Sequence, residues 1–136
     1  MKKKITVPVS FGELIDKITI LEIKQAKIKD TRKKKMITKE LDSLSKQLDK
    51  IKKSDGYLFV QLKILKDKLS LINKKLWKIE DRIRKHEREK DFGSDFIMLA
   101  RKVYLTNDKR FTIKNEIDKL LNSELQEVKH YKGYTA

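Results

Sequence analysis

The feature that most constrains this chain is a heptad seam that runs without interruption through its middle. The seam consists of leucine and isoleucine alone, at Leu58, Leu62, Leu65, Leu69, Ile72, Leu76, Ile79 and Ile83. Alternating steps of three and four residues bring these side chains to one face of a helix from about Tyr57 to Arg88. A helix with one long apolar stripe needs other helices to cover it. The seam therefore predicts an all-α fold, an antiparallel bundle of about four helices built on a long helical hairpin.

The remaining helices are predicted on both sides of this seam. One is expected over about Phe11 to Lys29, and another follows a break at residues 30–32. The second repeats the heptad spacing with Ile37, Leu41, Leu44, Leu48 and Ile51. A fourth is expected from about Asp95 to Asn122, after a short link in which Gly93 suits a C′ position and Ser94 an N-cap. Such a short link predicts antiparallel pairing of the third and fourth helices.

The connection between the second and third helices is open to two interpretations. Ser54, Asp55 and Gly56 predict a turn, because Asp and Gly both disfavour helix interiors. The seam of the second helix nevertheless continues in phase into the third. One continuous helix over about residues 33–88 is therefore the alternative to the preferred turn.

The first helix carries the clearest start signal in the chain. Ser10 and Glu13 have the spacing of a capping box, with Ser10 as the N-cap residue. Glu22 falls within the apolar face of this helix, whereas Ile20 and Ile23 lie on the opposite side. A helix with apolar residues on both sides is expected at the centre of the bundle or at a dimer contact.

Composition favours the same fold and limits the functions. The 136 residues include one proline and four glycines, which argues against a turn-rich β fold and fits one domain over residues 1–136. Residues 1–9 are expected as an extended lead-in and residues 124–136 as an extended tail. No apolar run is long enough to span a bilayer, and the N-terminus lacks the apolar core of a signal peptide, so a cytoplasmic protein without membrane insertion is expected. Without cysteine and with only two histidines, neither a metal site nor a cofactor is expected.

The formal net charge of +15 raises the question of nucleic-acid binding. The charge comes from 29 lysines and 6 arginines, and the lysines are spread along every segment. The densest cluster is the run Arg32, Lys33, Lys34 and Lys35, on a predicted linker. Dispersed lysines favour a solvated basic surface, so nucleic acid is an alternative partner rather than the preferred one.

A polar interruption in the fourth helix is the strongest candidate for a functional site. Phe96, Ala100 and Val103 set a core-facing stripe, and its spacing continues through three polar residues before apolar residues resume. These three residues are Asn107, Arg110 and Lys114. A buried cation without a partner costs several kcal/mol, so carboxylates are expected to meet this stretch from elsewhere in the chain.

The register of the hairpin and the faces of the helices predict that Glu22, Glu80 and Glu87 supply the carboxylates that pair with Arg110 and Lys114. Two interpretations of the resulting layer are open. The favoured one is a buried ion-pair network that fixes helix register in a non-enzymatic interaction or assembly module. In the other, Arg110 and Lys114 hold an anion such as phosphate or carboxylate in a small enzyme or metabolite-binding protein, with Glu22 or Glu80 as general base. A homodimer is also expected, because the long heptads and two-sided first helix leave apolar surface to cover.

Three blocks of the chain carry a family resemblance. They read PVSFGELIDKITILEIK at residues 8–24, LWKIEDRIR at residues 76–84 and VYLTNDKR at residues 103–110. With these blocks the chain resembles a small bacterial family of uncharacterised proteins, a domain of unknown function often met among genes for cell-surface polysaccharide synthesis. The resemblance implies a soluble helical protein with a link to envelope glycan assembly, and it implies no particular reaction.

Overall fold

The computed structural model describes residues 2–52 and 56–134, and this part of the chain contains four helices and no strand. The helices are α1 (Phe11–Lys27), α2 (Thr31–Lys52), α3 (Gly56–Glu89) and α4 (Ser94–Leu120). The predicted all-α fold and the number of helices are therefore confirmed. None of the described helices combines the length and apolar character needed to cross a bilayer.

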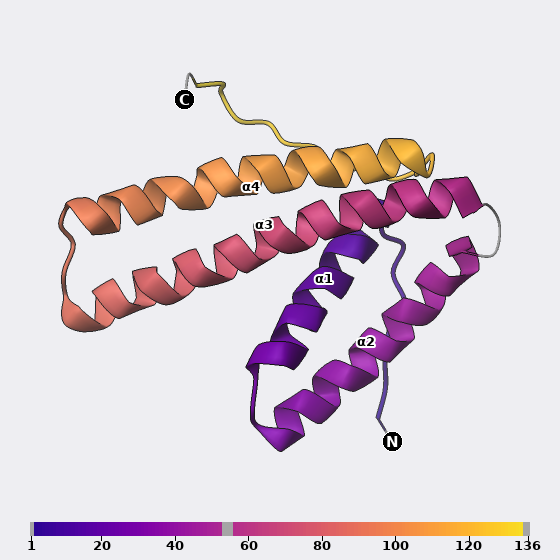
Figure 1. Cartoon of the computed structure of the whole chain (residues 1–136), viewed down its shortest axis with the longest axis horizontal. Coiled ribbons are helices and arrows are strands. Elements are labelled where there is room, and N and C mark those ends of the chain that lie inside the picture. Colours follow the sequence, from indigo (N-terminus) through magenta and orange to yellow (C-terminus); the bar gives the residue numbers. More distant parts are fainter. Residues whose placement is uncertain (1, 53–55, 135–136) are drawn as a thin grey trace.

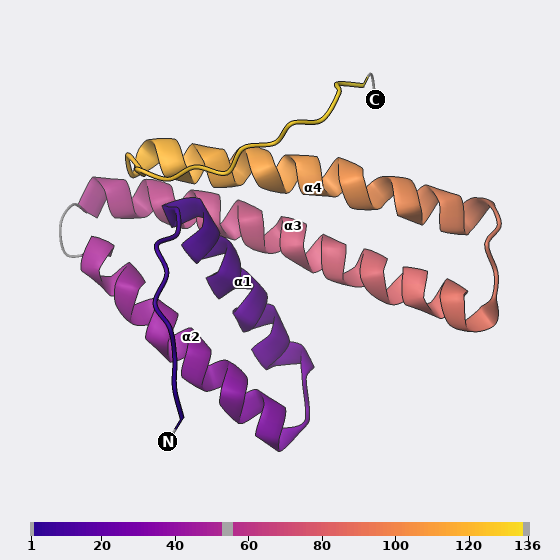
Figure 2. The ribbon, with the colours of Figure 1, turned by 180° about the vertical axis from the view of Figure 1, so that it is seen from behind.

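Two helical hairpins of unequal length make up the fold (Figure 1). The longer hairpin pairs α3 with α4, and its far end projects beyond the rest of the molecule. The shorter hairpin, α1 with α2, packs against the end of the long hairpin where α3 begins and α4 ends. Seen from behind in Figure 2, α1 lies between α2 and the α3–α4 pair. The predicted central position of α1 follows from this contact with all three other helices.

The hydrophobic core lies where the two hairpins meet. Three groups of side chains fill it: one face of α1, the heptad positions of α2 and α3, and the last turns of α4. Its buried members are Leu14, Ile15, Ile18, Leu21, Leu41, Leu48, Leu62, Leu69, Ile113 and Ile117. Ile72 of α3 still packs against this core, and further along the same helix Ile79 is buried in the hairpin with α4. The heptad seam of α3 is thus covered by the short hairpin near its start and by α4 further along.

The helix boundaries differ from the predicted ones at two links. Gly93 is the N-cap of α4 and Ser94 its first residue, whereas the sequence suggested Ser94 as the cap. The left-handed residue after α3 is Lys90, at φ 53°, rather than Gly93. At the other link, α1 ends at Lys27 rather than at about Lys29, and Asp30, just before α2, accepts a hydrogen bond from the Lys33 backbone N–H at 2.9 Å. In each case an aspartate side chain shapes the turn, because Asp91 likewise accepts from the Gly93 N–H at 3.2 Å.

The connection from α2 to α3 lies largely outside the described residues, so the predicted turn at Ser54 and Asp55 is not described by the structure. The two helices themselves run in different directions (Figure 1). A single continuous helix over residues 33–88 is therefore not formed.

Candidate functional site

The candidate site begins where the first turn of α1 meets the last turns of α4. Ser10 is the N-cap of α1, and its side chain accepts a hydrogen bond from the Glu13 backbone N–H at 3.1 Å. The Gly12 N–H donates to Asp118 Oδ1 at 2.7 Å. A carboxylate in this position is favoured by the partial positive charge at a helix N-terminus. Asp118 of α4 thus completes the cap of α1, so the two helix ends are joined by hydrogen bonds.

The backbones of α1 and α4 come unusually close at Gly12. A Cβ atom built on this residue would lie 2.4 Å from the Lys114 carbonyl oxygen and 3.0 Å from Asp118 Oδ1. No side chain fits at such a distance, so glycine is required for the approach of the two helices. This contact brings the carboxylates of α1 within reach of the cations of α4.

Asp16 is the centre of the polar cluster that results. It is completely buried, and its Oδ1 accepts hydrogen bonds from Arg110 Nε and from Asn73 Nδ2, both at 2.9 Å. Arg110 Nη2 pairs with the second carboxylate oxygen, so the guanidinium holds the carboxylate with two parallel bonds. The hydroxyl of Thr19 accepts from Asn73 and donates to the Asp16 carbonyl. One buried carboxylate therefore ties α1, α3 and α4 together.

Lys114 is the second cation of the cluster, and unlike Arg110 it is buried, with an exposed fraction of 5%. Its Nζ lies 2.8 Å from Glu13 Oε2, 2.7 Å from Glu127 Oε2 and 4.0 Å from Asp16 Oδ2. Burial lowers the pKa of Lys114, but the hydrogen bonds to Glu127 and Glu13 outweigh it and leave the pKa above its ordinary value. The lysine is therefore held as a cation. Glu13, expected to serve the helix cap, instead directs its carboxylate to this charge.

The three carboxylates nominated from the sequence do not join Arg110 and Lys114. Glu22 pairs with Lys66 at 2.8 Å, Glu80 with Arg84 at 3.7 Å and Glu87 with Lys90 at 3.2 Å. All three glutamates are exposed. They lie on the solvent side of their helices, and each forms an ion pair there with a nearby basic side chain. The cluster contains Asp16, Glu13 and Glu127 in their place.

A second face of α1 contains the residues that the sequence analysis missed. Steps of four, three and four residues connect Gly12, Asp16, Thr19 and Ile23, and all four are buried. The step pattern is that of a helical stripe, and glycine at its start is the signal that another backbone approaches. The apolar residues Ile20 and Ile23 had pointed to this side without identifying Asp16.

The buried face of α4 is also slightly rotated from the predicted stripe. Leu99, Thr106, Ile113 and Ile117 are buried, whereas Ala100 of the predicted stripe is exposed. Lys114 lies at the buried edge of this face. Asn107 and Arg110 are half-buried on its flank, and the Arg110 Nη1 group donates to Asn107 Oδ1 at 3.4 Å. Because of this rotation, the guanidinium of Arg110 lies beside a cavity and not in the core.

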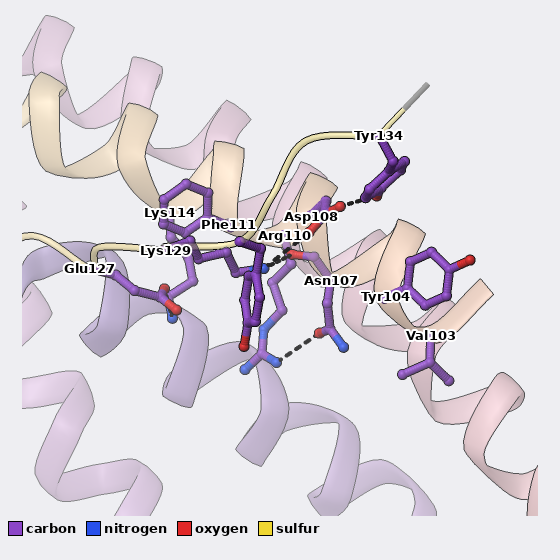
Figure 3. Close-up of a pocket in the computed structure, with 11 residues that line it drawn as sticks. Val103, Tyr104, Asn107, Asp108, Arg110, Phe111, Lys114, Glu127, Lys129 and Tyr134 are labelled. Carbon is purple, nitrogen blue, oxygen red and sulfur yellow. Dashed lines mark hydrogen bonds and ion pairs between the residues drawn. The ribbon is translucent and has the colours of Figure 1, made fainter. Parts of the chain in front are cut away.

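This cavity lies between α4 and the segment that follows it, and it has a volume of about 580 Å³. Figure 3 shows Arg110 and Asn107 extending from α4 beside it, with Tyr104 and Tyr134 at one end and Lys114 and Glu127 at the other. A volume of this size is typical of small-molecule sites. The polar cluster is therefore closed around Asp16 and meets the cavity at Arg110 and Lys114.

The segment over residues 124–134 forms the outer wall of the cavity and is named the C-terminal strap. It has no regular secondary structure, in agreement with the predicted extended tail. Lys129 Nζ lies 3.3 Å from Asp108 Oδ1 and 5.2 Å from the centre of the Phe111 ring. The Tyr134 hydroxyl donates to the other oxygen of Asp108, and its ring packs edge-on against Tyr104. Together with the pair between Glu127 and Lys114, these contacts to Asp108 hold the strap to α4 at both ends of the cavity.

The charges around the cavity are matched within the site. Among the described residues it is lined by three cations, Arg110, Lys114 and Lys129. Four carboxylates lie within ion-pair distance of them: Asp16, Glu13, Glu127 and Asp108. In a chain of formal net charge +15, the cavity is thus a place where acidic groups are concentrated. No group of three or more histidine, cysteine, aspartate or glutamate side chains among the described residues is arranged to hold a metal ion.

Asp118 gives the contact between α1 and α4 a pH dependence. Burial raises the pKa of this carboxyl above its ordinary value of 3.8, against the hydrogen bonds from Gly12 and Ser10. A raised folded-state pKa means that the folded protein binds the proton more tightly, so stability declines as pH rises from about 3.8 through that pKa. We expect Asp118→Asn, which is uncharged at every pH, to lack this decline. Urea unfolding of both proteins between pH 3 and 8 measures this difference. If the free energies of unfolding of the two proteins changed with pH in the same way, Asp118 would not be the source of the decline.

Comparison with known proteins assigns the chain at the level of a family. Residues 5–136 match the model of a family of unknown function, DUF6165, and the chain belongs to this family. The predicted membership of a family of uncharacterised proteins is therefore confirmed. The link of that family to genes for polysaccharide synthesis stays a prediction. No curated protein and no solved structure matches the chain.

Proposed function

We propose that this member of the DUF6165 family is a non-enzymatic binding protein for a small, uncharged, hydroxyl-rich ligand such as a sugar. The ligand occupies the cavity between α4 and the C-terminal strap. The observation that carries the proposal is the combination of charge-matched polar groups with aromatic rings around one open cavity. The buried part of the polar cluster has a separate, structural role, because it fixes the helices that form the wall of the cavity.

The charge balance argues against an anionic ligand. Arg110 is held by Asp16, Lys114 by Glu13 and Glu127, and no cation of the cavity is without a carboxylate among the described residues. A phosphate or carboxylate would add negative charge to a site in which four carboxylates already face three cations, and this repulsion would cost free energy. A neutral ligand meets no such cost.

The same groups suit a ligand with many hydroxyls. Arg110 uses three of its five N–H groups within the protein, toward Asp16 and Asn107, and the others remain for a ligand. Paired charges hold their side chains in fixed orientations, so hydrogen bonds to a ligand require little reorganisation.

Aromatic side chains supply the apolar part of the site. Four rings line the cavity, those of Tyr104, Phe111, Tyr131 and Tyr134. The flat C–H faces of a sugar ring pack on such aromatic faces, while tyrosine hydroxyls can bond to ligand oxygens. This ligand class agrees with the proposed link to cell-surface polysaccharide synthesis, which rests on the family resemblance alone.

Isothermal titration calorimetry with a panel of small molecules tests the proposal. The panel contains neutral hexoses and N-acetylhexosamines, with inorganic phosphate and a hexose phosphate as charged counterparts. We expect saturable binding of at least one neutral sugar, with a dissociation constant in the range of about 10 μM to 1 mM for a ligand of this size. Binding of the charged compounds alone would contradict the proposal and favour the anionic-ligand alternative.

A strap residue that lines the cavity provides a variant with little effect on folding. Tyr131 is 84% exposed and contributes little to the core. We expect Tyr131→Ala to weaken sugar binding about tenfold, which corresponds to the loss of one aromatic contact of about 1.4 kcal/mol. His130→Ala is the matched control, because His130 is the exposed neighbour of Tyr131 and does not line the cavity. Equal affinities for the two variants and the wild type would place the ligand elsewhere.

A further inference from the structure

The tip of the α1–α2 hairpin, residues 24–39, carries the densest positive charge of the chain. Its basic residues are Lys24, Lys27, Lys29, Arg32, Lys33, Lys34, Lys35 and Lys39. The one acidic residue, Asp30, accepts a backbone hydrogen bond at the start of α2. The basic tip, as this region is named, therefore has a net charge of +7, almost half of the net charge of the chain. No ion pair neutralises these eight side chains within the described residues.

The N-terminal segment adds to this charge at the same end of the molecule. Figures 1 and 2 show residues 2–9 running from the start of α1 along the short hairpin, away from α4. Lys2, Lys3 and Lys4 stand at its outer end and are exposed. The charge is thus concentrated at one pole of the molecule, opposite the cavity and the C-terminal strap.

Exposed aliphatic side chains accompany these lysines. Met36 lies within the basic tip and is 67% exposed, while Ile5 and Val7 of the N-terminal segment are 89% and 61% exposed. None of the three packs into the core. Basic residues together with unpacked aliphatic residues are the combination that binds the interface of an anionic bilayer, where charge and apolar burial both contribute.

We infer that the basic tip docks the protein on a membrane surface that contains anionic lipids. Lysine ammonium groups contact the lipid phosphates, and Met36, Ile5 and Val7 enter the boundary between head groups and acyl chains. A nucleic acid is the less suitable partner, since recognition of nucleic acid relies on arginine and on stacking aromatic rings. The basic tip contains one arginine and no aromatic residue.

Docking through the basic tip leaves the cavity free. In Figure 1 the tip and the C-terminal strap lie at opposite edges of the molecule, with α3 and the remaining turns of α1 and α2 between them. A docked protein would therefore present α4 and the strap to the aqueous phase. The inference does not depend on the identity of the ligand in the cavity, and substitutions in the tip leave the cavity unchanged.

Co-sedimentation with lipid vesicles tests the inference on the full chain. We expect binding to vesicles of phosphatidylcholine with about one third phosphatidylglycerol, and at least tenfold weaker binding to phosphatidylcholine alone. The variant Lys33→Gln, Lys34→Gln, Lys35→Gln removes three charges of the tip and should weaken binding roughly 100-fold, because each basic residue near an anionic surface contributes about fivefold.

The matched control removes the same charge elsewhere. Lys63, Lys68 and Lys75 are exposed on α3, outside the tip, so changing these three to glutamine should alter binding less than about threefold. Equal losses for the two triple variants would overturn the inference, since net charge rather than the tip would then govern binding. Absence of binding to the anionic vesicles, or tighter tip-dependent binding to duplex DNA at the same salt concentration, would also overturn it.

The aliphatic side chains provide an independent measurement. Ile5→Ser combined with Val7→Ser preserves every charge and touches no core residue. We expect this variant to bind anionic vesicles at least fivefold more weakly, because apolar burial in the interface is lost. Unchanged binding would contradict the docking geometry in which the N-terminal segment enters the membrane interface.

Discussion

Replacing Asp16 by alanine is expected to lower the free energy of unfolding by about 3–5 kcal/mol, the range for breaking a buried ion pair from one side. The substitution removes the buried carboxylate that pairs with Arg110 and leaves Lys114 with one carboxylate fewer. It also removes one of the two acceptors of Asn73 Nδ2, the other being the Thr19 hydroxyl. Urea unfolding monitored by circular dichroism measures the effect directly.

Glu80→Ala is the control for this variant. Glu80 also pairs with an arginine, but its partner Arg84 is one helical turn away and both side chains are exposed. Exposed pairs of this kind contribute less than about 0.5 kcal/mol. Equal and small losses for Asp16→Ala and Glu80→Ala would mean that the buried cluster does not stabilise the contact between α1 and α4.

Gly12→Ala is the second substitution with a large expected effect. The new methyl group would lie 2.4 Å from the Lys114 carbonyl oxygen, a distance that neither backbone can accommodate without moving. Separating α1 from α4 would also lengthen the hydrogen bond from the Gly12 N–H to Asp118. We expect a loss of about 3 kcal/mol, at the upper end of the range for overpacking, measured as a lower urea midpoint.

Gly56→Ala gives the matched comparison within the same chain. Gly56 begins α3, and a Cβ atom there would have no neighbour within 4 Å. Alanine restricts the unfolded chain more than glycine does, so this variant should be neutral or more stable by up to about 1 kcal/mol. If Gly12→Ala were as stable as Gly56→Ala, the close approach of α1 and α4 would not be a feature of the folded protein.

The helices could be predicted because their heptads are nearly free of interruption. Steps of three and four residues in α2 and α3 identify one apolar face each, and the link around Gly93 is too short for anything but an antiparallel pair. The turn residues were harder to assign. Lys90, three residues before Gly93, adopts the left-handed conformation, and the Asp91 N–H then closes the helix end by donating to the His86 carbonyl oxygen.

The cations of the candidate site could be predicted, but their partners could not. Arg110 and Lys114 interrupt an apolar stripe, and the cost of burying charge requires carboxylates nearby. Helix faces and hairpin register pointed to Glu22, Glu80 and Glu87, which are exposed and pair with other basic side chains. Asp16 lies on a second buried face of α1, whose signal is Gly12 followed by short polar side chains rather than a run of leucine.

The cavity could not be predicted from the pattern of the chain. Its outer wall is the C-terminal strap, which has no helical or strand periodicity to fix its path. The strap follows α4 because Lys129 and Tyr134 both reach Asp108, and Glu127 reaches Lys114. Such contacts depend on the register of α4 against an irregular segment, which spacing along the sequence does not encode.

A double-mutant cycle on Asp16 and Arg110 tests most directly the claim that the polar stripe of α4 is matched by a carboxylate of α1. The unfolding free energies of Asp16→Ala, Arg110→Met, the double variant and the wild type are measured by urea titration under one set of conditions. The two carboxylate oxygens and the guanidinium act as a unit, so we expect an interaction energy of about 2 kcal/mol or more, with the double variant more stable than Asp16→Ala alone. Losses that add to within about 0.5 kcal/mol would contradict the account, because the two side chains would then stabilise the fold independently.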